Sequence, residues 1–475
     1  MKVALVYMDR ALNTSGLSQR HVTSDPLGIR YLAGHAHNAG HDVKVYLQGS
    51  RSLEEMTEYI TADNLDLVGF SCLTYNLPIS QEIAKRLKKH KKNPKIVFGG
   101  EHPSLSPETT FTSDVDAVIK GEGEITFAEL LTALEENISL DSVPGLYLPF
   151  SGGPRFTSPR KQTEIDSLAW PLRDEQIIKS TRMNSFMYPS PYKQTGLITL
   201  LGSRGCSFSC IYCSSHELWG NRTRFRNVTD VSDEIEDVYR KTSANVGVFY
   251  DLTFNVNSEW VNRLCDELIN RKINEKMSFY STCRVSAPNG RLILTKDVLQ
   301  KMKKAGFSKI GIGIESTDDI IAGEYKNGKS PWDNTLEVVN FAHVIGMLVR
   351  GFLMIGGPKE TPKTYEEAKK RLNSIPLHDL RVGYLTPLPG TSLDSQYPIE
   401  KRYTNDLARY DCSNPIIQSP CFTYEQLVGM ERDLLKHFHN SNYRSSVISN
   451  IVKREQRLED SAKWRIEDLK KKGLI

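Results

Sequence analysis

Residues 203–220 read SRGCSFSCIYCSSHELWG and place three cysteines, Cys206, Cys210 and Cys213, within one short loop. An apolar run typical of a buried strand directly precedes this loop. A structural zinc site needs four ligands, usually in two separated pairs, and His216 is the nearest candidate for the fourth. A 4Fe–4S cluster held by only three cysteines keeps one iron open for another ligand. The spacing favours such an open cluster, with zinc as the alternative.

The sequence after this loop repeats strand and helix signals. Six strand–helix units between residues 195 and 400 are fewer than the eight of a complete barrel, so we expect a partial (β/α)6 TIM barrel. Active sites of such barrels lie at the carboxyl ends of the strands. The strand signals are residues 196–202, 246–252, 277–284, 309–316, 349–357 and 381–390, and helix signals between them include 231–241, 258–272, 295–306 and 334–346.

The sequence before the loop alternates strands and helices in the same way. Short apolar strands separated by helices predict a parallel sheet covered on both faces, a doubly wound (Rossmann-like) domain. Its strand signals are residues 3–8, 41–47, 66–72, 95–100 and 116–124. We expect this domain to span residues 1–148, followed by a Pro-, Gly- and Ser-rich linker at 149–194, the barrel at 195–400 and a charged helical region at 401–475.

Three loops at the carboxyl edge of the first sheet predict a ligand site. They read SCLTYN (71–76), GGEHPS (99–104) and GEGE (121–124). Ligands of doubly wound sheets bind beyond this edge, and glycines let the backbone approach a large flat ligand. A G-x-G-x-x-G fingerprint does not follow the first strand signal, so we do not expect NAD.

The composition is that of a water-soluble globular protein, with 39% hydrophobic and 25% charged residues. A net charge of +4 gives no reason to expect a nucleic-acid partner. No apolar run reaches the ~18 residues of a membrane span, and we expect a cytoplasmic protein. Eight cysteines in so long a chain are too few for a disulfide scaffold, and Cys412 with Cys421 are too few for a second cluster.

The C-x-x-x-C-x-x-C loop after the first barrel strand, with Tyr212 before its last cysteine, resembles that of the radical S-adenosylmethionine (SAM) enzymes. The resemblance implies that Cys206, Cys210 and Cys213 hold a 4Fe–4S cluster whose open iron binds SAM. An electron from the cluster then cleaves SAM to a deoxyadenosyl radical. The cofactors supply this chemistry, while the protein orients and shields them.

Further motifs resemble those of the same family, in the order that the family places them. They are FYDLTF (249–254), with Leu252 in place of a second acid, GIES (313–316), MIGGPKET (354–361) and TPLPGTSL (386–393). Arg284, at the expected end of the third barrel strand, is added to these motifs because an arginine there can pair with a carboxylate group. The implied SAM-binding residues are Tyr212, Asp251, Arg284, Glu315, Gly356, Gly357 and Pro358.

A doubly wound domain before such a barrel resembles the cobalamin-binding radical SAM enzymes, over roughly residues 1–400. The D-x-H-x-x-G motif that supplies a histidine to cobalt in other cobalamin proteins is absent, so no histidine ligand from it is implied. His35, His37 and His41 are expected to be structural. The implied cobalamin-binding residues are Ser71, Leu73, Thr74, Tyr75, Gly99, Gly100, Glu101, His102, Gly121, Glu122, Gly123 and Glu124.

The resemblance implies methylation of an unactivated carbon, or of phosphorus, through methylcobalamin and a deoxyadenosyl radical. We expect a small-molecule or lipid-type substrate and an electron donor such as flavodoxin or ferredoxin. The candidate substrate-positioning residues, which could equally be loop caps, are Asn255, Asn257, Tyr384 and Thr386.

Three alternatives remain. A cobalamin-dependent radical enzyme could instead catalyse cyclisation, rearrangement or oxidation without net methylation. A non-enzymatic cobalamin and redox sensor would not need the SAM motifs. A methylthiotransferase needs a second cluster held by N-terminal cysteines, and only Cys72 lies in that domain, which argues against it.

Overall fold

The computed structural model describes residues 1–8, 26–49, 51–175, 178 and 190–440. Its first sheet has the strand order β2-β1-β3-β4-β5-β6-β7. Strands β1 to β5 are parallel, and they are the five expected from the sequence. The bounds are β1 Lys2–Tyr7, β2 Asp42–Leu47, β3 Leu67–Ser71, β4 Lys95–Gly99, β5 Ala117–Ile119, β6 Leu146–Leu148 and β7 Arg155–Phe156.

The antiparallel strands β6 and β7 extend this sheet past residue 148. We expected a linker from residue 149, yet β7 pairs with β6 inside that stretch. Only two residues long, β7 shows little of the alternation that marks a strand in a sequence. The first sheet therefore draws on part of the expected linker.

Helices cover both faces of the first sheet, as the doubly wound pattern predicts. Side chains alternate across a strand, so Val3 and Leu5 face α1 and α6, while Ala4 and Val6 face α2 and α3. Each face buries its own apolar cluster. The helices of this domain are α1 Leu27–Asn38, α2 Leu53–Thr61, α3 Leu77–Lys88, α4 Glu101–Leu105, α5 Pro107–Thr110 and α6 Glu124–Glu135.

The second sheet has six parallel strands in the order β8-β11-β12-β13-β14-β15. Strands β8 and β15 form its two edges, so the barrel is open, as expected from six units. The bounds are β8 Leu197–Leu200, β11 Val246–Phe249, β12 Ser278–Cys283, β13 Phe307–Glu315, β14 Leu348–Ile355 and β15 Asp379–Tyr384.

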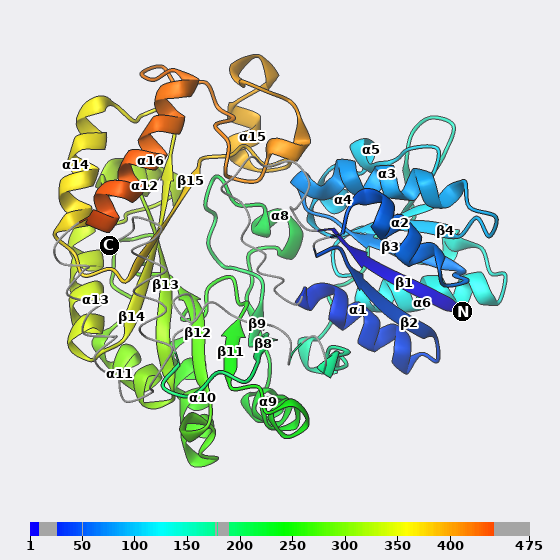
Figure 1. Ribbon diagram of the computed structural model, residues 1–475, viewed down its shortest axis with the longest axis horizontal. Coiled ribbons are helices and arrows are strands. Elements are labelled where there is room, and N and C mark those ends of the chain that lie inside the picture. The colour runs from blue at the N-terminus through cyan, green and yellow to red at the C-terminus, as the bar shows by residue number, and fades with distance from the viewer. Residues whose placement is uncertain (9–25, 50, 176–177, 179–189, 441–475) are drawn as a thin grey trace.

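One large apolar cluster joins this sheet to the helices on its outer face. A smaller cluster of Leu197, Val246, Val248 and Tyr280 lies apart from it, on the other side of the strands. Figure 1 shows the barrel and the first domain side by side, with α8 between them. The helices are α8 Ser215–Trp219, α9 Val228–Thr242, α10 Ser258–Asn270, α11 Lys296–Lys304, α12 Asp319–Tyr325, α13 Trp332–Val344, α14 Pro362–Asn373, α15 Ser392–Gln396 and α16 Tyr424–Asn440.

The C-terminal region differs from the helical region expected from residue 401. Residues 402–423 are mostly irregular, with one short 3-10 turn at Leu407–Arg409, and α16 begins only at Tyr424. Leu427, Leu434 and other apolar residues of α16 pack into the barrel core. Residues 441–475 of the expected charged helical region lie outside the described residues.

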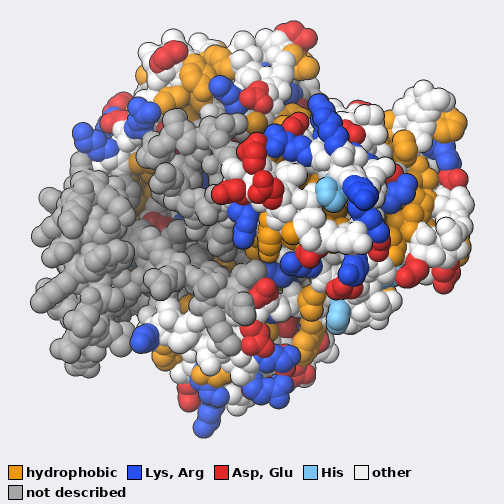
Figure 2. Space-filling model, turned by 45° about the vertical axis from the view of Figure 1, so that its right-hand side comes forward, with side chains coloured by type: hydrophobic (Ala, Val, Ile, Leu, Met, Phe, Trp, Pro, Cys, Tyr) orange, Lys and Arg blue, Asp and Glu red, His pale blue; other side chains and the backbone are white. Residues whose placement is uncertain are grey.

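Basic and acidic side chains are interspersed on the face shown in Figure 2, in keeping with the small net charge. Among the residues that the structure describes, we find no helix that is both long and apolar enough to cross a membrane.

Candidate functional site

The cysteine loop is fixed at its base and at its middle. Strand β9 (Ser203–Arg204) pairs with β10 (Arg224–Phe225) and closes the base. In the middle, the Ile211 N–H donates to the Tyr325 carbonyl at 3.0 Å, and the Ile211 carbonyl accepts from the Leu393 N–H at 2.9 Å. The ends of α12 and α15 therefore hold the loop at the carboxyl edge of the barrel.

Each cysteine of the loop has one polar partner. Cys206 is buried and the other two are half-buried, and none forms a disulfide. Thr253 Oγ1 lies 3.6 Å from Cys206 Sγ, and Ser215 Oγ lies 3.1 Å from Cys213 Sγ. Arg284 Nη1 donates to Cys210 Sγ at 3.2 Å. Burial raises the pKa of the Cys210 and Cys213 thiols, an effect that a coordinated metal reverses.

The three cysteines do not form, with His216, the ligand set of one zinc ion in the described part of the chain. In the described part of the chain, no three His, Cys, Asp or Glu side chains form the ligand set of a single metal ion. A zinc ion held by these cysteines and His216 would need such a set. A 4Fe–4S cluster uses one cysteine for each ligated iron, and its ligands are spread around it. The chemistry of the three thiols fits a cluster.

Arg284 sits at the end of β12 in a fixed position. The Asn255 side-chain amide donates to the Arg284 carbonyl and accepts from its N–H, both at 2.9 Å. The guanidinium donates to the Ser286 carbonyl at 2.8 Å and lies over the Phe208 ring, 4.1 Å from its centre. Asn255, a candidate substrate residue, therefore uses both ends of its amide to hold the backbone of Arg284.

Asp251 joins the ends of β8 and β11. Its carboxylate accepts from the Gly202 N–H at 3.0 Å and from the Ser203 hydroxyl at 2.6 Å. Burial raises its pKa to about 6, against the opposing effect of these donors. In this arrangement Asp251 shapes the first residues of the cysteine loop.

Glu315 ends β13 in an uncommon conformation, with φ +63° in a non-glycine residue. Tyr212 donates its hydroxyl to Glu315 Oε1 at 3.0 Å, which ties the cysteine loop to the fourth barrel strand. Burial raises the pKa of Glu315, and Lys326 opposes that shift. Strained backbone of this kind gathers at functional sites. The structure thus brings the expected Tyr212 and Glu315 together.

The GGP turn after β14 is held by a carboxylate that the sequence reasoning missed. The Gly356 N–H donates to Glu360 Oε2 at 3.0 Å, and burial raises the pKa of Glu360 to about 7. Gly356 has φ +80°, and a Cβ at Gly357 would lie 1.6 Å from the Tyr325 hydroxyl. Pro358 follows, half-buried. Gly356 is therefore needed for its positive φ, and Gly357 for the close approach of Tyr325.

The other candidate substrate residues also have internal partners. Asn257 caps α10 by accepting from the Trp260 N–H. The Tyr384 hydroxyl shares its one proton between the Leu427 carbonyl oxygen at 3.2 Å and a Glu431 carboxylate oxygen at 3.0 Å, which fastens α16 to β15. Thr386 donates to the Tyr384 carbonyl. Each of these side chains therefore has at least one partner within the protein.

The loops after β3 and β4 pack tightly against each other. Gly100 has φ +102°, and a Cβ there would lie 2.7 Å from the Cys72 carbonyl oxygen. The buried His102 ring contacts the Thr74 and Thr109 hydroxyls at 3.2 and 2.8 Å. Burial lowers its pKa to about 4, so the ring is neutral. His102 and Thr74, both expected to contact cobalamin, are engaged with each other.

Three acidic residues expected at cobalamin also contact the barrel. Glu101 accepts from the Ser214 hydroxyl, next to Cys213. Glu124 pairs with Arg204, and Glu122 pairs with Arg224. Burial opposes ionisation of Glu124, but Arg204 outweighs it and lowers the pKa of that carboxyl. The local pattern GEGE could not reveal a partner from another domain.

The remaining residues expected to bind cobalamin, at the carboxyl edge of the first sheet, are partly exposed or next to open space. Ser71, Leu73 and Tyr75 are half-buried, and Gly99 backs onto Ile119. Gly121 has φ +75° and open space where a Cβ would stand, whereas a Cβ at Gly123 would meet Leu32. An open glycine beside half-buried side chains is a surface that a flat ligand can approach.

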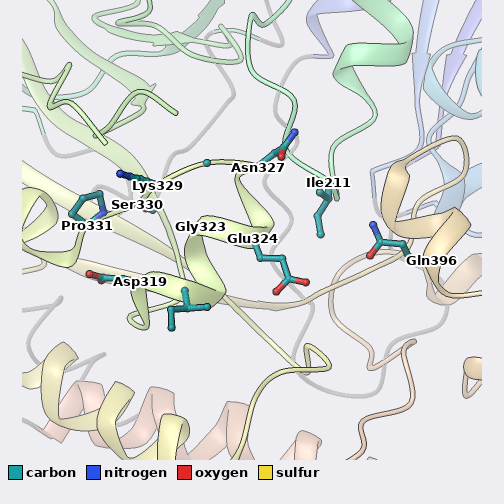
Figure 3. A pocket seen from close by; sticks show the side chains of 11 residues that line it. Ile211, Asp319, Gly323, Glu324, Asn327, Lys329, Ser330, Pro331 and Gln396 are labelled. Atoms are coloured by element: carbon teal, nitrogen blue, oxygen red, sulfur yellow. The ribbon is translucent and has the colours of Figure 1, made fainter. Parts of the chain in front are cut away.

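A cavity of about 650 Å³ lies beside the cysteine loop, where Ile211 faces α12 and Gln396 (Figure 3). Asn327, on its wall, donates to the Ser209 hydroxyl. None of the residues expected to bind SAM, cobalamin or substrate lines it. The cavity therefore adjoins the cysteine loop at Ile211 but includes none of the residues expected to bind a cofactor or substrate.

Two protein families match the chain, one in each of its two expected domains. Residues 17–131 match the B12 binding domain, and residues 200–372 match the Radical SAM superfamily. An uncharacterized methyltransferase of Pyrococcus horikoshii is 28% identical over 429 residues, 88% of each chain. An anaerobic magnesium-protoporphyrin IX monomethyl ester cyclase of Rubrivivax gelatinosus is 23% identical over 88% of this chain and 73% of its own.

The fold is also that of a solved enzyme. The radical SAM methyltransferase TsrM from Kitasatospora setae, with cobalamin and a [4Fe-4S] cluster bound, matches with a TM-score of 0.69 at 17% identity, over 91% of both chains. The two domains, their order and the enzymatic relatives agree. This chain belongs to the cobalamin-binding radical SAM enzymes, whose cofactors are a 4Fe–4S cluster, SAM and cobalamin.

Proposed function

We propose that this enzyme methylates an unactivated carbon, or phosphorus, of a small-molecule or lipid-type intermediate. Cys206, Cys210 and Cys213 hold the cluster in this proposal, and the loops after β3, β4 and β5 face the cobalamin. When bound, these cofactors supply a methyl group and a radical that abstracts hydrogen. A protein acid–base pair is not required for either task.

One observation carries the proposal: the cysteine loop and the cobalamin edge are fastened to each other. Glu101 lies at the end of β4 and contacts Ser214, directly after Cys213. Glu124, after β5, pairs with Arg204, which stands two residues before Cys206. A methyl donor and a radical source must act on one substrate, and this interface keeps their binding loops adjacent.

The residues around the loop have positioning roles. Tyr212 and Glu315 join the loop to β13, and Asp251 joins its start to β11. These buried contacts fix the loop before any cofactor arrives, which lowers the entropic cost of ordering it on binding. SAM is expected to sit between the loop and the ends of β11 to β14.

Net methylation is favoured over ring closure by the Pyrococcus horikoshii relative and by the TsrM fold. The Rubrivivax gelatinosus relative is a cyclase, so cyclisation is the second candidate. The two differ in one product: methylation leaves S-adenosylhomocysteine and 5′-deoxyadenosine together, whereas cyclisation leaves no S-adenosylhomocysteine.

The first experiment needs no substrate. Protein reconstituted with iron, sulfide and cobalamin without oxygen should cleave SAM when dithionite is added, and should move a labelled SAM methyl group into the cobalamin fraction. Replacing the three loop cysteines by alanine should remove the iron absorbance and leave cobalamin bound, while Cys412→Ala, at an exposed cysteine, should change neither. Iron retained without the loop cysteines would refute the ligand assignment.

The second experiment tests the outcome on a substrate, once a candidate is found. Labelled methyl-SAM should add one methyl group for each 5′-deoxyadenosine formed. Methylation without 5′-deoxyadenosine would refute the radical route. Turnover without gain of the label would favour cyclisation or rearrangement.

A further inference from the structure

The three loop cysteines share a feature that the cofactor assignment does not explain. Each sulfur has a different side chain from a different element beside it: Thr253 at Cys206, Arg284 at Cys210 and Ser215 at Cys213. Iron binds the thiolate form of cysteine, which has no proton to give. Toward a bound cluster, the hydroxyls and the guanidinium can therefore act only as donors.

We propose that Thr253, Arg284 and Ser215 set the reduction potential of the cluster, and that Arg284 has the largest effect. Reduction adds one electron, so the reduced cluster carries more negative charge on its sulfur atoms. Hydrogen-bond donors and a positive charge stabilise that state more than the oxidised one, and potentials of such clusters depend on both. All three donors raise the potential.

The surroundings of Arg284 favour a role at the sulfur. Nε donates to the Ser286 carbonyl, and Nη2 contacts the Lys326 carbonyl at 3.4 Å. The guanidinium plane rests on Phe208, and Asn255 holds the backbone. These contacts aim Nη1 at Cys210 and leave little freedom to follow another ligand. The sequence motif had assigned this arginine to SAM, so the two roles must be separated by experiment.

Redox titration of the cluster without SAM, followed by electron paramagnetic resonance, measures the effect directly. Arg284→Gln removes the charge, Thr253→Val and Ser215→Ala remove the hydroxyls, and each should shift the midpoint potential to more negative values. The matched control is Ser281→Ala, because Ser281 lies 3.7 Å from the sulfur of Cys283, which is not a cluster ligand. That variant should leave the potential unchanged.

Equilibrium binding of SAM to the oxidised cluster separates the two roles of Arg284. A shifted potential with SAM affinity within twofold of the parent supports the proposal. An unchanged potential with SAM affinity lowered tenfold or more would assign the guanidinium to SAM and overturn it. If Arg284→Gln loses iron, Arg284→Lys and the two hydroxyl variants are judged by the same criterion.

This inference rests on the proposed cluster site, and the experiment distinguishes the two. If the parent protein gives no cluster signal, the proposed function fails. If the parent signal is normal and the three variants titrate like Ser281→Ala, only the tuning role fails.

Discussion

Replacing Glu124 by glutamine should loosen the two domains from each other. Glu124 and Arg204 belong to different domains, and their side chains are only 5% and 7% exposed. Glutamine keeps the size of the side chain and removes its charge. The carboxylate left beside the Arg204 guanidinium would then be Glu122, at 3.7 Å, which already pairs with Arg224.

The size of the effect follows from the burial of the pair. Removing one partner of a buried ion pair costs ~3–5 kcal/mol, because the other charge remains buried without its partner. The remaining carboxylate of Glu122 compensates in part, so we expect about 3 kcal/mol, the low end of that range. Exposed pairs contribute less than ~1 kcal/mol, and Arg240 with Asp237, whose arginine is 77% exposed, offers such a pair as the control.

Urea unfolding compares the variants, and amide hydrogen exchange locates the change. Glu124→Gln should lower the free energy of unfolding by about 3 kcal/mol, and Asp237→Asn by less than ~1 kcal/mol. If the opening is local, exchange at residues 121–126 and 203–206 should accelerate on the order of a hundredfold, since 1.4 kcal/mol is a factor of ten. Equal losses for the two variants would refute the argument.

A double variant separates pairing from desolvation. Glu124→Leu with Arg204→Met removes both charges, and burial of two apolar side chains in their place is often neutral or stabilising. It should be more stable than Glu124→Gln alone. If it is less stable than Glu124→Gln, the unpaired charge of Arg204 is not the main source of the loss, and the reasoning about magnitude is wrong.

Two further predictions concern the first domain. Gly100→Ala should destabilise it by more than Gly121→Ala. Both glycines have positive φ, a conformation that costs other residues ~1–3 kcal/mol, but only a Cβ at 100 would also meet the Cys72 backbone. Equal losses in urea unfolding would contradict this packing argument. Burial lowers the pKa of His102 to about 4, so its contribution to stability is present above pH 6.5 and is lost as the pH falls toward 4. In His102→Gln the free energy of unfolding should therefore fall less steeply with acid, by up to ~1.4 kcal/mol per pH unit. Identical pH profiles for the variant and the parent would refute a buried neutral ring.

The sequence alone predicted most of the architecture. Hydrophobic periodicity, and the Gly and Pro residues between segments, located the parallel strands of both sheets. These strands are easy to find because buried apolar residues dominate them. Prediction from the sequence failed where an element is too short to show a pattern, or where contacts distant in the chain hold a segment in place. Strand β7 has two residues, and residues 402–423 are held by contacts such as the Tyr403 N–H to the Ile416 carbonyl rather than by a repeating pattern.

Within the site, motifs predicted positions better than partners. Tyr212 and Glu315 meet, as the shared strand edge implies, although they are 103 residues apart. Glu124, in contrast, stands in a glycine-rich loop that fits a cofactor equally well. Its choice of Arg204 depends on how the domains pack, and no local pattern encodes that arrangement.

For Arg284 too, the motif predicted the position of the residue but not its partner. An arginine at a strand end can pair with a carboxylate or with a thiolate. Residue type and position therefore do not distinguish binding of the SAM carboxylate from a hydrogen bond to a cluster cysteine. The structure adds what the motif lacks, namely the Asn255, Ser286 and Phe208 contacts that fix its direction. The contacts direct the guanidinium at Cys210, and the redox titration tests whether that contact raises the potential at which the cluster accepts its electron.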